Sequence, residues 1–184
     1  MKVIFLDRDG VINKYPGDRE YVKGWGQFEF ISGVIPALEK LSAEAYAIFI
    51  ISNQAGVAKG IYSQESLDKI NKNMLEELGP RIKVSGIYYC THREEDNCSC
   101  RKPKTGSIEK ALAGLKESGH KVNLNRSFFV GDTIRDIETG KTAGLKTILV
   151  FSGKEKPENK DNWKIQPDFT AQDLSGAVKI ILKE

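Results

Sequence analysis

The sequence has few cysteines, no long hydrophobic run and no large excess of charge of either sign. Its longest apolar runs, residues 3–6 and 47–51, are far shorter than the ~18 residues that a membrane-spanning helix needs. Lys and Arg number 28 and Asp and Glu number 25, so the formal net charge is +3, too small to indicate a nucleic acid or a membrane surface as partner. An anion would therefore have to be bound by a local site.

The first residues contain no apolar stretch of signal-peptide length, and we expect a cytoplasmic protein that acts as a monomer without a membrane partner. The chain has 184 residues, of which 40% are hydrophobic and 29% charged, which is typical of one domain spanning residues 1–184. In a reducing compartment, three cysteines more often bind a metal or stay free thiols than form disulfides.

Short apolar segments alternate with helical patterns along the whole chain. This alternation predicts an α/β fold with a doubly wound, Rossmann-like parallel sheet and helices on both of its faces. The predicted strands are 2–6, 46–51, 86–90, 127–130 and 147–151, and the predicted helices are 34–45, 64–78, 107–118, 133–143 and 174–182. The second helix is expected to bury Leu67, Ile70, Met74, Leu75 and Leu78.

Polar side chains follow three of the predicted strands at the point where each strand ends. Asp7 and Asp9 follow the first strand, Ser52 and Asn53 the second, and Asp132 the fourth. In doubly wound sheets the ligand crevice lies at the carboxyl ends of the strands, so we expect these residues to converge. Clustered carboxylates raise one another's pKa, and a hard cation removes that penalty. The sequence therefore predicts a Mg²⁺ site formed by Asp7, Asp132 and a backbone carbonyl near Asp9.

The same residue types can transfer a phosphoryl group. Asp7 could attack phosphorus and become an aspartyl phosphate, while Asp9 could protonate the leaving oxygen and later deprotonate water. Ser52 could donate to a phosphoryl oxygen, and Lys102 could neutralise the developing charge. Each residue alone has a simpler explanation, such as a turn for the Asp pair or a helix cap for Asp132. Their combination in strand order favours a phosphoryl-transfer site.

The three cysteines lie close to one histidine, within residues 90–100. Cys90, His92, Cys98 and Cys100 could complete the tetrahedral coordination of Zn²⁺. Four protein ligands leave no open position, so the ion would be structural and would clamp an irregular loop. The alternative is a set of free thiols beside an exposed histidine.

Four segments resemble the motifs of the haloacid dehalogenase superfamily, and more closely its histidinol-phosphate and heptose-bisphosphate phosphatase branch. They are DRDGVIN (7–13), SNQAGVAKG (52–60), CRKPKTG (100–106) and VGDTIRD (130–136). The resemblance implies a phosphatase with Asp7 as nucleophile, Asp9 as acid and base, Ser52 as phosphate ligand, Lys102 as charge-stabilising lysine, Asp132 as Mg²⁺ ligand and Asp136 in support. The Cys-x-His and Cys-x-Cys pairs also resemble a loop of this branch, in which zinc would direct Arg101 and Lys102 into the site.

The segment 53–60 is similar to the heptose-bisphosphate type, which implies a sugar bisphosphate as substrate, hydrolysed to the 1-phosphate. Asn53 and Arg101 would then bind substrate, with Arg101 on the second phosphate unless it is an ordinary surface arginine. The five residues between His92 and Cys98 are also typical of histidinol-phosphate enzymes, so histidinol phosphate remains an alternative. The intervals between the motifs are too short for a large cap domain.

Two hypotheses from other classes remain open. A phospho-switch protein of the receiver type also uses carboxylates, Mg²⁺ and a lysine on a parallel sheet, but its phosphorylated Asp belongs to a later strand. A nucleic-acid end-processing phosphatase could share the uncapped fold, but it would need a continuous basic groove. The only basic stretch here, residues 154–164, is interleaved with acids and is expected to be a solvated loop.

Overall fold

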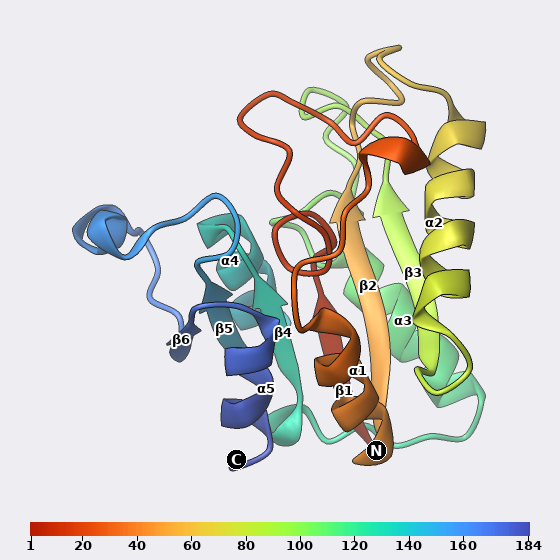
Figure 1. Ribbon diagram of the computed structural model, residues 1–184. Coiled ribbons are helices and arrows are strands. Elements are labelled where there is room, and N and C mark those ends of the chain that lie inside the picture. Colours follow the sequence, from red (N-terminus) through yellow and green to blue (C-terminus); the bar gives the residue numbers. More distant parts are fainter.

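The computed structural model describes all 184 residues, which form six strands, five α-helices and three short 3-10 helices (Figure 1). The strands are β1 (Lys2–Leu6), β2 (Tyr46–Asn53), β3 (Val84–Cys90), β4 (Phe128–Gly131), β5 (Lys146–Val150) and β6 (Phe169–Ala171). The α-helices are α1 (Val34–Ala43), α2 (Gln64–Leu78), α3 (Gly106–Glu117), α4 (Ile134–Thr142) and α5 (Leu174–Ile181). None of these helices has the length and apolar character needed to cross a membrane.

The six strands form one parallel sheet in the order β3-β2-β1-β4-β5-β6. The chain starts at the centre with β1, builds outward to β3, and returns to the other side of β1 with β4. The order therefore reverses between β1 and β4, which is where such sheets bind ligands. At that point the amide of Asp7, just beyond β1, donates to the carbonyl of Val130 in β4 at 3.0 Å. The predicted doubly wound fold is confirmed.

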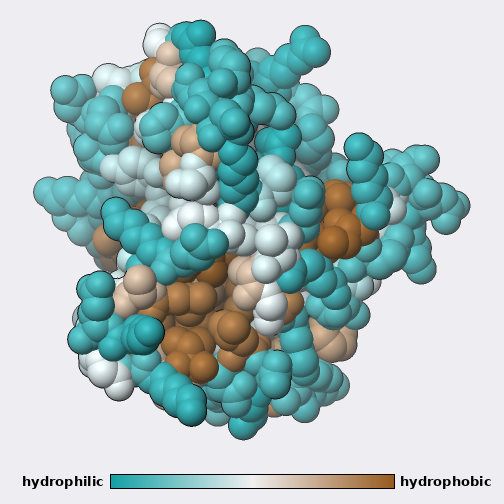
Figure 2. All heavy atoms as spheres, turned by 180° about the vertical axis from the view of Figure 1, so that it is seen from behind, coloured by the Kyte–Doolittle hydropathy of each residue, from teal (hydrophilic) through white to brown (hydrophobic).

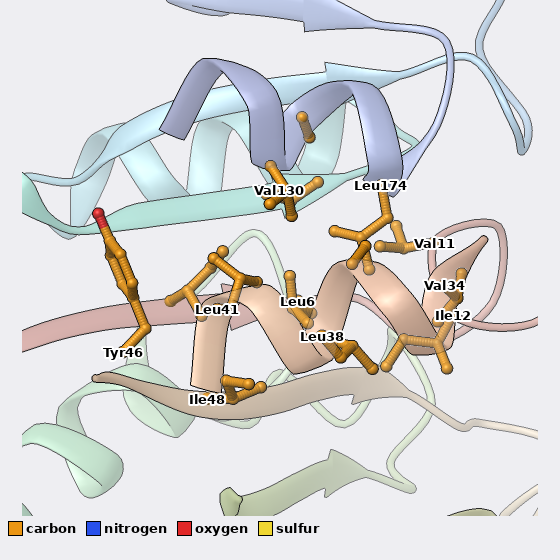
Figure 3. Close-up of a cluster of buried hydrophobic side chains, with 14 of the residues drawn as sticks. Leu6, Val11, Ile12, Val34, Leu38, Leu41, Tyr46, Ile48, Val130 and Leu174 are labelled. Carbon is orange, nitrogen blue, oxygen red and sulfur yellow. The ribbon is translucent and has the colours of Figure 1, made fainter. Parts of the chain in front are cut away.

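Alternate residues of each central strand face opposite sides of the sheet. In β1, Ile4 and Leu6 pack against α1 and α5, together with Met74 of α2, as Figure 3 shows for Leu6. Val3 and Phe5 point to the other side, which α3 and α4 cover. Because both faces are buried, the strands are continuous apolar runs, which is why they were predicted correctly.

The side covered by α3 and α4 keeps some apolar surface open. Figure 2 shows an apolar patch there, surrounded by hydrophilic side chains. A shallow groove on this side is lined in part by Leu112, Val122 and Leu124, which pack against the buried cluster around Phe5.

Two expectations about the elements are wrong. Leu75 is 41% exposed, because the buried stripe of α2 runs through Leu67, Ile70, Met74 and Leu78 and leaves Leu75 one residue outside it. The sixth strand, β6, was not predicted, because it has only three residues and none of them is fully buried.

No separate cap domain interrupts the chain. The interval between the first two motifs holds a loop, the 3-10 helix Trp25–Gln27, α1 and β2, and the next interval holds α2, β3 and the cysteine loop. The loop from residue 14 to 33 rises past the carboxyl ends of the strands (Figure 1) and is held at its base by an antiparallel bridge between Asn13 and Phe30. It therefore forms one wall beside the ligand edge of the sheet.

Candidate active site

A cleft with a volume of about 210 Å³ opens at the carboxyl ends of β1, β2 and β4. The structure brings together in it the residues predicted to transfer the phosphoryl group and to bind or support magnesium: Asp7, Asp9, Ser52, Lys102, Asp132 and Asp136. They come from four separate segments of the chain, and the strand order explains why they meet. The cleft also holds Tyr15, Arg19 and Arg135, which the sequence analysis did not single out.

Lys102 forms the centre of the charge arrangement. Its Nζ lies 2.9 Å from Oδ1 of Asp7 and 2.6 Å from Oδ1 of Asp136, and it donates to the carbonyl of Ile51 at 3.0 Å. The side chain is 3% exposed. Burial alone would lower the pKa of Lys102, but the carboxylates of Asp136 and Asp7 outweigh it and raise that pKa. Lys102 is therefore a fixed positive charge beside the predicted nucleophile.

Three carboxylates surround this one lysine. Oxygen atoms of Asp7, Asp132 and Asp136 all lie within 4.8 Å of one another. Burial raises the pKa of Asp7 to about 7 against the pull of Lys102, and burial together with the charge of Asp7 raises the pKa of Asp132 well above its usual value. The three carboxylates carry more negative charge than one lysine can neutralise, so a divalent cation would balance the charge of the site. Oxygen atoms are the ligands that Mg²⁺ prefers. This donor set fits magnesium.

Asp132 lies between two glycines. A Cβ atom on Gly10 would lie 2.3 Å from Oδ2 of Asp132, and one on Gly153 would lie 2.0 Å from the same atom. Oδ2 also accepts a hydrogen bond from the backbone amide of Lys154 at 2.8 Å. The segment that begins at Gly153 is thus part of the site, although the sequence indicated only a solvated loop there.

Asp136 has a supporting place at the start of α4. Its Oδ2 accepts hydrogen bonds from the backbone amide of Thr133 at 3.0 Å and from the Thr133 hydroxyl at 2.6 Å, while Oδ1 faces Lys102. The bond from the Thr133 amide is part of a capping box with Thr133 as the N-cap residue, so Asp132 is not the helix cap that was considered for it. The carboxylate of Asp132 does not cap the helix and lines the cleft instead.

The carboxylate of Asp9 is held by hydrogen-bond donors on several sides. Arg8 donates to it from Nε and Nη2 at 3.2 and 3.1 Å, Asn13 donates at 2.9 Å, and Gln54 donates at 2.9 Å. Burial opposes ionisation of Asp9, but the charge of Arg8 and these hydrogen bonds outweigh it and lower its pKa. In the absence of substrate Asp9 is therefore an ionised, oriented carboxylate.

Ser52 and Asn53, at the end of β2, make different contacts. Ser52 lines the cleft and accepts from the Gln54 amide at 2.7 Å. Asn53 also reaches the cleft, but its amide group pairs with the backbone of Lys102 in both directions, each bond being 3.1 Å long. Asn53 thus fixes the loop that carries Lys102, and its predicted contact with substrate stays a prediction.

The cysteine loop gathers its four predicted ligands. Sγ of Cys98 lies 3.5 Å from that of Cys90 and 3.4 Å from that of Cys100, and Nδ1 of His92 lies 3.5 and 3.3 Å from the sulfurs of Cys90 and Cys100. A tetrahedral zinc ion with ordinary bond lengths would separate its ligands by about 3.5–3.8 Å. Burial favours the neutral thiol of Cys98, yet hydrogen bonds from its neighbours lower the pKa of Cys98 to about 7. The donor set fits zinc.

Arg101 does not line the same cleft as Asp7. It borders a neighbouring depression together with Asn97 and Lys104, and its Nη1 donates to the carbonyl of His92 at 3.3 Å. Arg19 and Arg135 are the arginines that line the cleft itself. Arg135 lies three residues after Asp132, so the expectation that the ligand site lies at the carboxyl ends of the strands could have indicated it. Arg19 lies in a loop without a periodic pattern, and no feature of the sequence indicated it.

Comparison with known proteins agrees with this geometry. The HAD-hydrolase-like family model matches residues 99–177. The chain is 37% identical over 188 residues to D-glycero-beta-D-manno-heptose-1,7-bisphosphate 7-phosphatase of Pasteurella multocida, with 98% of this chain and 96% of that one aligned. It is 36% identical to the D-glycero-alpha-D-manno-heptose-1,7-bisphosphate 7-phosphatase of Campylobacter jejuni, with 84% of this chain and 85% of that one aligned. The crystal structure of D,D-heptose 1,7-bisphosphate phosphatase from B. bronchiseptica, complexed with magnesium and phosphate, matches with a TM-score of 0.85 and 27% identity, covering 100% of this chain and 99% of that one.

Proposed function

The chain belongs to the haloacid dehalogenase superfamily and to its heptose-bisphosphate phosphatase family, and from this membership we propose that it removes the 7-phosphate of D-glycero-D-manno-heptose 1,7-bisphosphate. The product is the 1-phosphate. The observation that carries the proposal is the position of Lys102, which bridges Asp7 and Asp136 in the cleft that also holds Asp9 and Asp132. A buried ammonium beside a nucleophilic carboxylate is suited to a phosphoryl group.

In the first step, a carboxylate oxygen of Asp7 attacks phosphorus, and the bond between phosphorus and the sugar oxygen breaks. Asp9 gives a proton to that oxygen. The negative charge of a bound phosphate favours the protonated form of Asp9, since like charges raise a carboxyl pKa. In the second step Asp9, now ionised and held by Arg8 and Asn13, takes a proton from the water that attacks the aspartyl phosphate. Phosphate leaves, and Asp7 is restored.

Lys102 and Ser52 hold the phosphoryl oxygens during both steps. Lys102 balances the charge that builds on them, and the hydroxyl of Ser52 donates a hydrogen bond. Asp7, Asp132 and the backbone carbonyl of Asp9 would hold Mg²⁺, and the cation supplies positive charge that lets the Asp7 carboxylate and an anionic phosphate approach each other. Asp136 keeps Lys102 in place.

We propose that Cys90, His92, Cys98 and Cys100 hold a structural zinc ion in a single domain of residues 1–184. The loop between β3 and α3 contains no helix or strand, and the ion would stabilise its conformation. This loop leads directly into Arg101 and Lys102. Zinc and the Asn53 amide would then fix Lys102 from two sides. The predicted location in the cytoplasm and the predicted monomeric state remain part of this proposal; the residues assigned to the reaction all come from one chain, so a monomer would contain a complete site.

Phosphate release from a panel of substrates tests the proposal. The panel contains both anomers of the heptose bisphosphate, fructose 1,6-bisphosphate, histidinol phosphate and a 5′-phosphorylated oligonucleotide. We expect the highest kcat/KM for a heptose bisphosphate, with turnover that depends on Mg²⁺. Equal or better hydrolysis of histidinol phosphate would refute the substrate assignment, and a single turnover without further release would indicate a phospho-switch.

A further inference from the structure

Gln54 connects two groups of the active site from beneath the cleft. Its side chain is 2% exposed and does not line the cleft. The amide nitrogen donates one hydrogen bond to Oδ2 of Asp9 at 2.9 Å and another to Oγ of Ser52 at 2.7 Å. An amide group has two protons, so both are used by groups to which the proposed mechanism gives a task.

The carboxylate of Asp9 and the hydroxyl of Tyr62 together fix which way this amide faces. Tyr62 donates from Oη to Oε1 of Gln54 at 2.6 Å. If the amide were turned over, its carbonyl oxygen would face the carboxylate of Asp9, and two acceptors would be in contact without a proton between them. The observed orientation therefore satisfies all three partners, and the Tyr62 hydroxyl is the donor that holds it.

The ring of Tyr62 is closely packed. The side chain is 8% exposed, and its ring lies directly against Gly56, where a Cβ atom would be 2.1 Å from Cε1 of the ring. The backbone amide of Ile61 closes the intervening loop by donating to the carbonyl of Gly56 at 2.9 Å. The hydroxyl is thus presented to Gln54 by a closely packed, hydrogen-bonded turn.

We propose that Tyr62 and Gln54 are positioning residues that set Asp9 and Ser52 for the reaction together. Gln54 directs the carboxylate of Asp9, which exchanges a proton with the leaving oxygen and with water. Because Ser52 accepts from Gln54 and its own proton is given to no protein group, that hydroxyl proton is free for the phosphate. This inference rests on the proposed function, since it assigns a purpose to Asp9 and Ser52 only in phosphate-ester hydrolysis.

The choice of leaving group separates positioning from a merely structural role. A sugar oxygen is a poor leaving group and needs the proton of Asp9, whereas p-nitrophenolate leaves without one. Tyr62→Phe removes the donor to Oε1, so the Gln54 side chain is held only through its nitrogen. We expect it to lower kcat/KM for the heptose bisphosphate about tenfold, a part of the 10²–10⁴ that general acid catalysis contributes. The loss on p-nitrophenyl phosphate should be clearly smaller, because only the contribution of Ser52 is shared by the two substrates.

A double-mutant cycle tests whether Tyr62 acts through Gln54. We expect Gln54→Leu to lower heptose bisphosphate turnover at least as much as Tyr62→Phe, and the double variant to be no worse than Gln54→Leu. Tyr89→Phe is the control, since its hydroxyl likewise bonds side chains, Asp68 and Gln64, but away from the cleft. It should leave both activities unchanged.

Equal losses on the two substrates, or additive losses in the cycle, would overturn the proposal. Thermal unfolding identifies any variant that fails to fold. If Tyr62→Phe does so, the leaving-group ratio of Gln54→Leu decides by itself, because that variant also removes the contact with Asp9. A wild-type protein that releases no phosphate from any ester would refute the proposed function instead.

Discussion

Replacing Gly153 by alanine should disable the site without unfolding the protein. A Cβ atom at this position would lie 2.0 Å from Oδ2 and 2.6 Å from Cβ of Asp132, whereas ordinary contact begins near 3.4 Å. Either the backbone at Gly153 or the carboxylate must therefore move by about 1.4 Å. Bonds to Mg²⁺ are about 2.0–2.1 Å long and tolerate little displacement, and an error of 1 Å in a catalytic arrangement lowers the rate about 10²-fold.

We expect Gly153→Ala to lower kcat/KM about 100-fold and to raise the Mg²⁺ concentration needed for half-maximal activity. Phosphate release measured over a magnesium titration would show both effects. The matched control is Gly26→Ala, since a Cβ atom there meets nothing within 4 Å. A Gly153→Ala enzyme with unchanged magnesium dependence and rate would contradict the placement of Asp132 as a metal ligand.

Four further changes have distinct expected outcomes. Asp7→Asn should abolish turnover while the melting temperature stays near that of the wild type, and substantial residual phosphate release would remove Asp7 as nucleophile. Cys98→Ser should lose bound zinc and stability together, so unchanged zinc by elemental analysis would contradict the four-ligand site. Arg101→Ala should raise KM for a bisphosphate more than for a monophosphate; equal effects would place the second phosphate elsewhere, with the arginines of the main cleft as the next candidates. Asp168→Asn should lower the free energy of unfolding by about 1 kcal/mol at neutral pH, and the difference should shrink as the pH falls below about 4.

The pH dependence of the last prediction follows from the pKa of Asp168. Burial would raise this pKa, but the ion pair with Lys141 and hydrogen bonds from Thr147 at 2.7 and 2.9 Å outweigh it and lower it. A carboxyl whose pKa is lower in the folded state stabilises the fold above its unfolded pKa and loses that effect as it becomes protonated. Urea unfolding at several pH values measures the free energy of unfolding of the wild type and of Asp168→Asn. A difference between the two proteins that does not vary with pH would contradict the lowered pKa of Asp168.

The fold was predictable because its strands are buried on both faces. Burial of this kind produces continuous apolar runs such as 3–6 and 47–51, and alternation with helices then indicates a parallel sheet. The edge strand β6 gave no such run, because it has only three residues and its middle residue, Thr170, is exposed. Leu75 is apolar but lies outside the helical stripe that α2 buries, so its hydrophobic character alone wrongly predicted burial.

The candidate site was predictable where it depends on strand ends. Asp7, Asp9, Ser52 and Asp132 each follow an apolar run, and one topological rule brings them together. What the sequence could not indicate are contacts between loops, such as the Tyr62 hydroxyl on Gln54 or the close approach of Gly153 to Asp132. Such contacts have no period and no fixed spacing, so only the folded chain shows them.

The hydrogen bond from the Asp7 amide to the Val130 carbonyl has a wider consequence. It continues the pairing of β1 with β4, so the two carboxylates at the tips of these strands are spaced by the innermost framework of the molecule. The parts that would meet the sugar, residues 14–33 and 91–104, are attached outside that framework. Insertions or exchanges in these outer segments can redirect the enzyme to other phosphate esters while the reacting groups keep their distance.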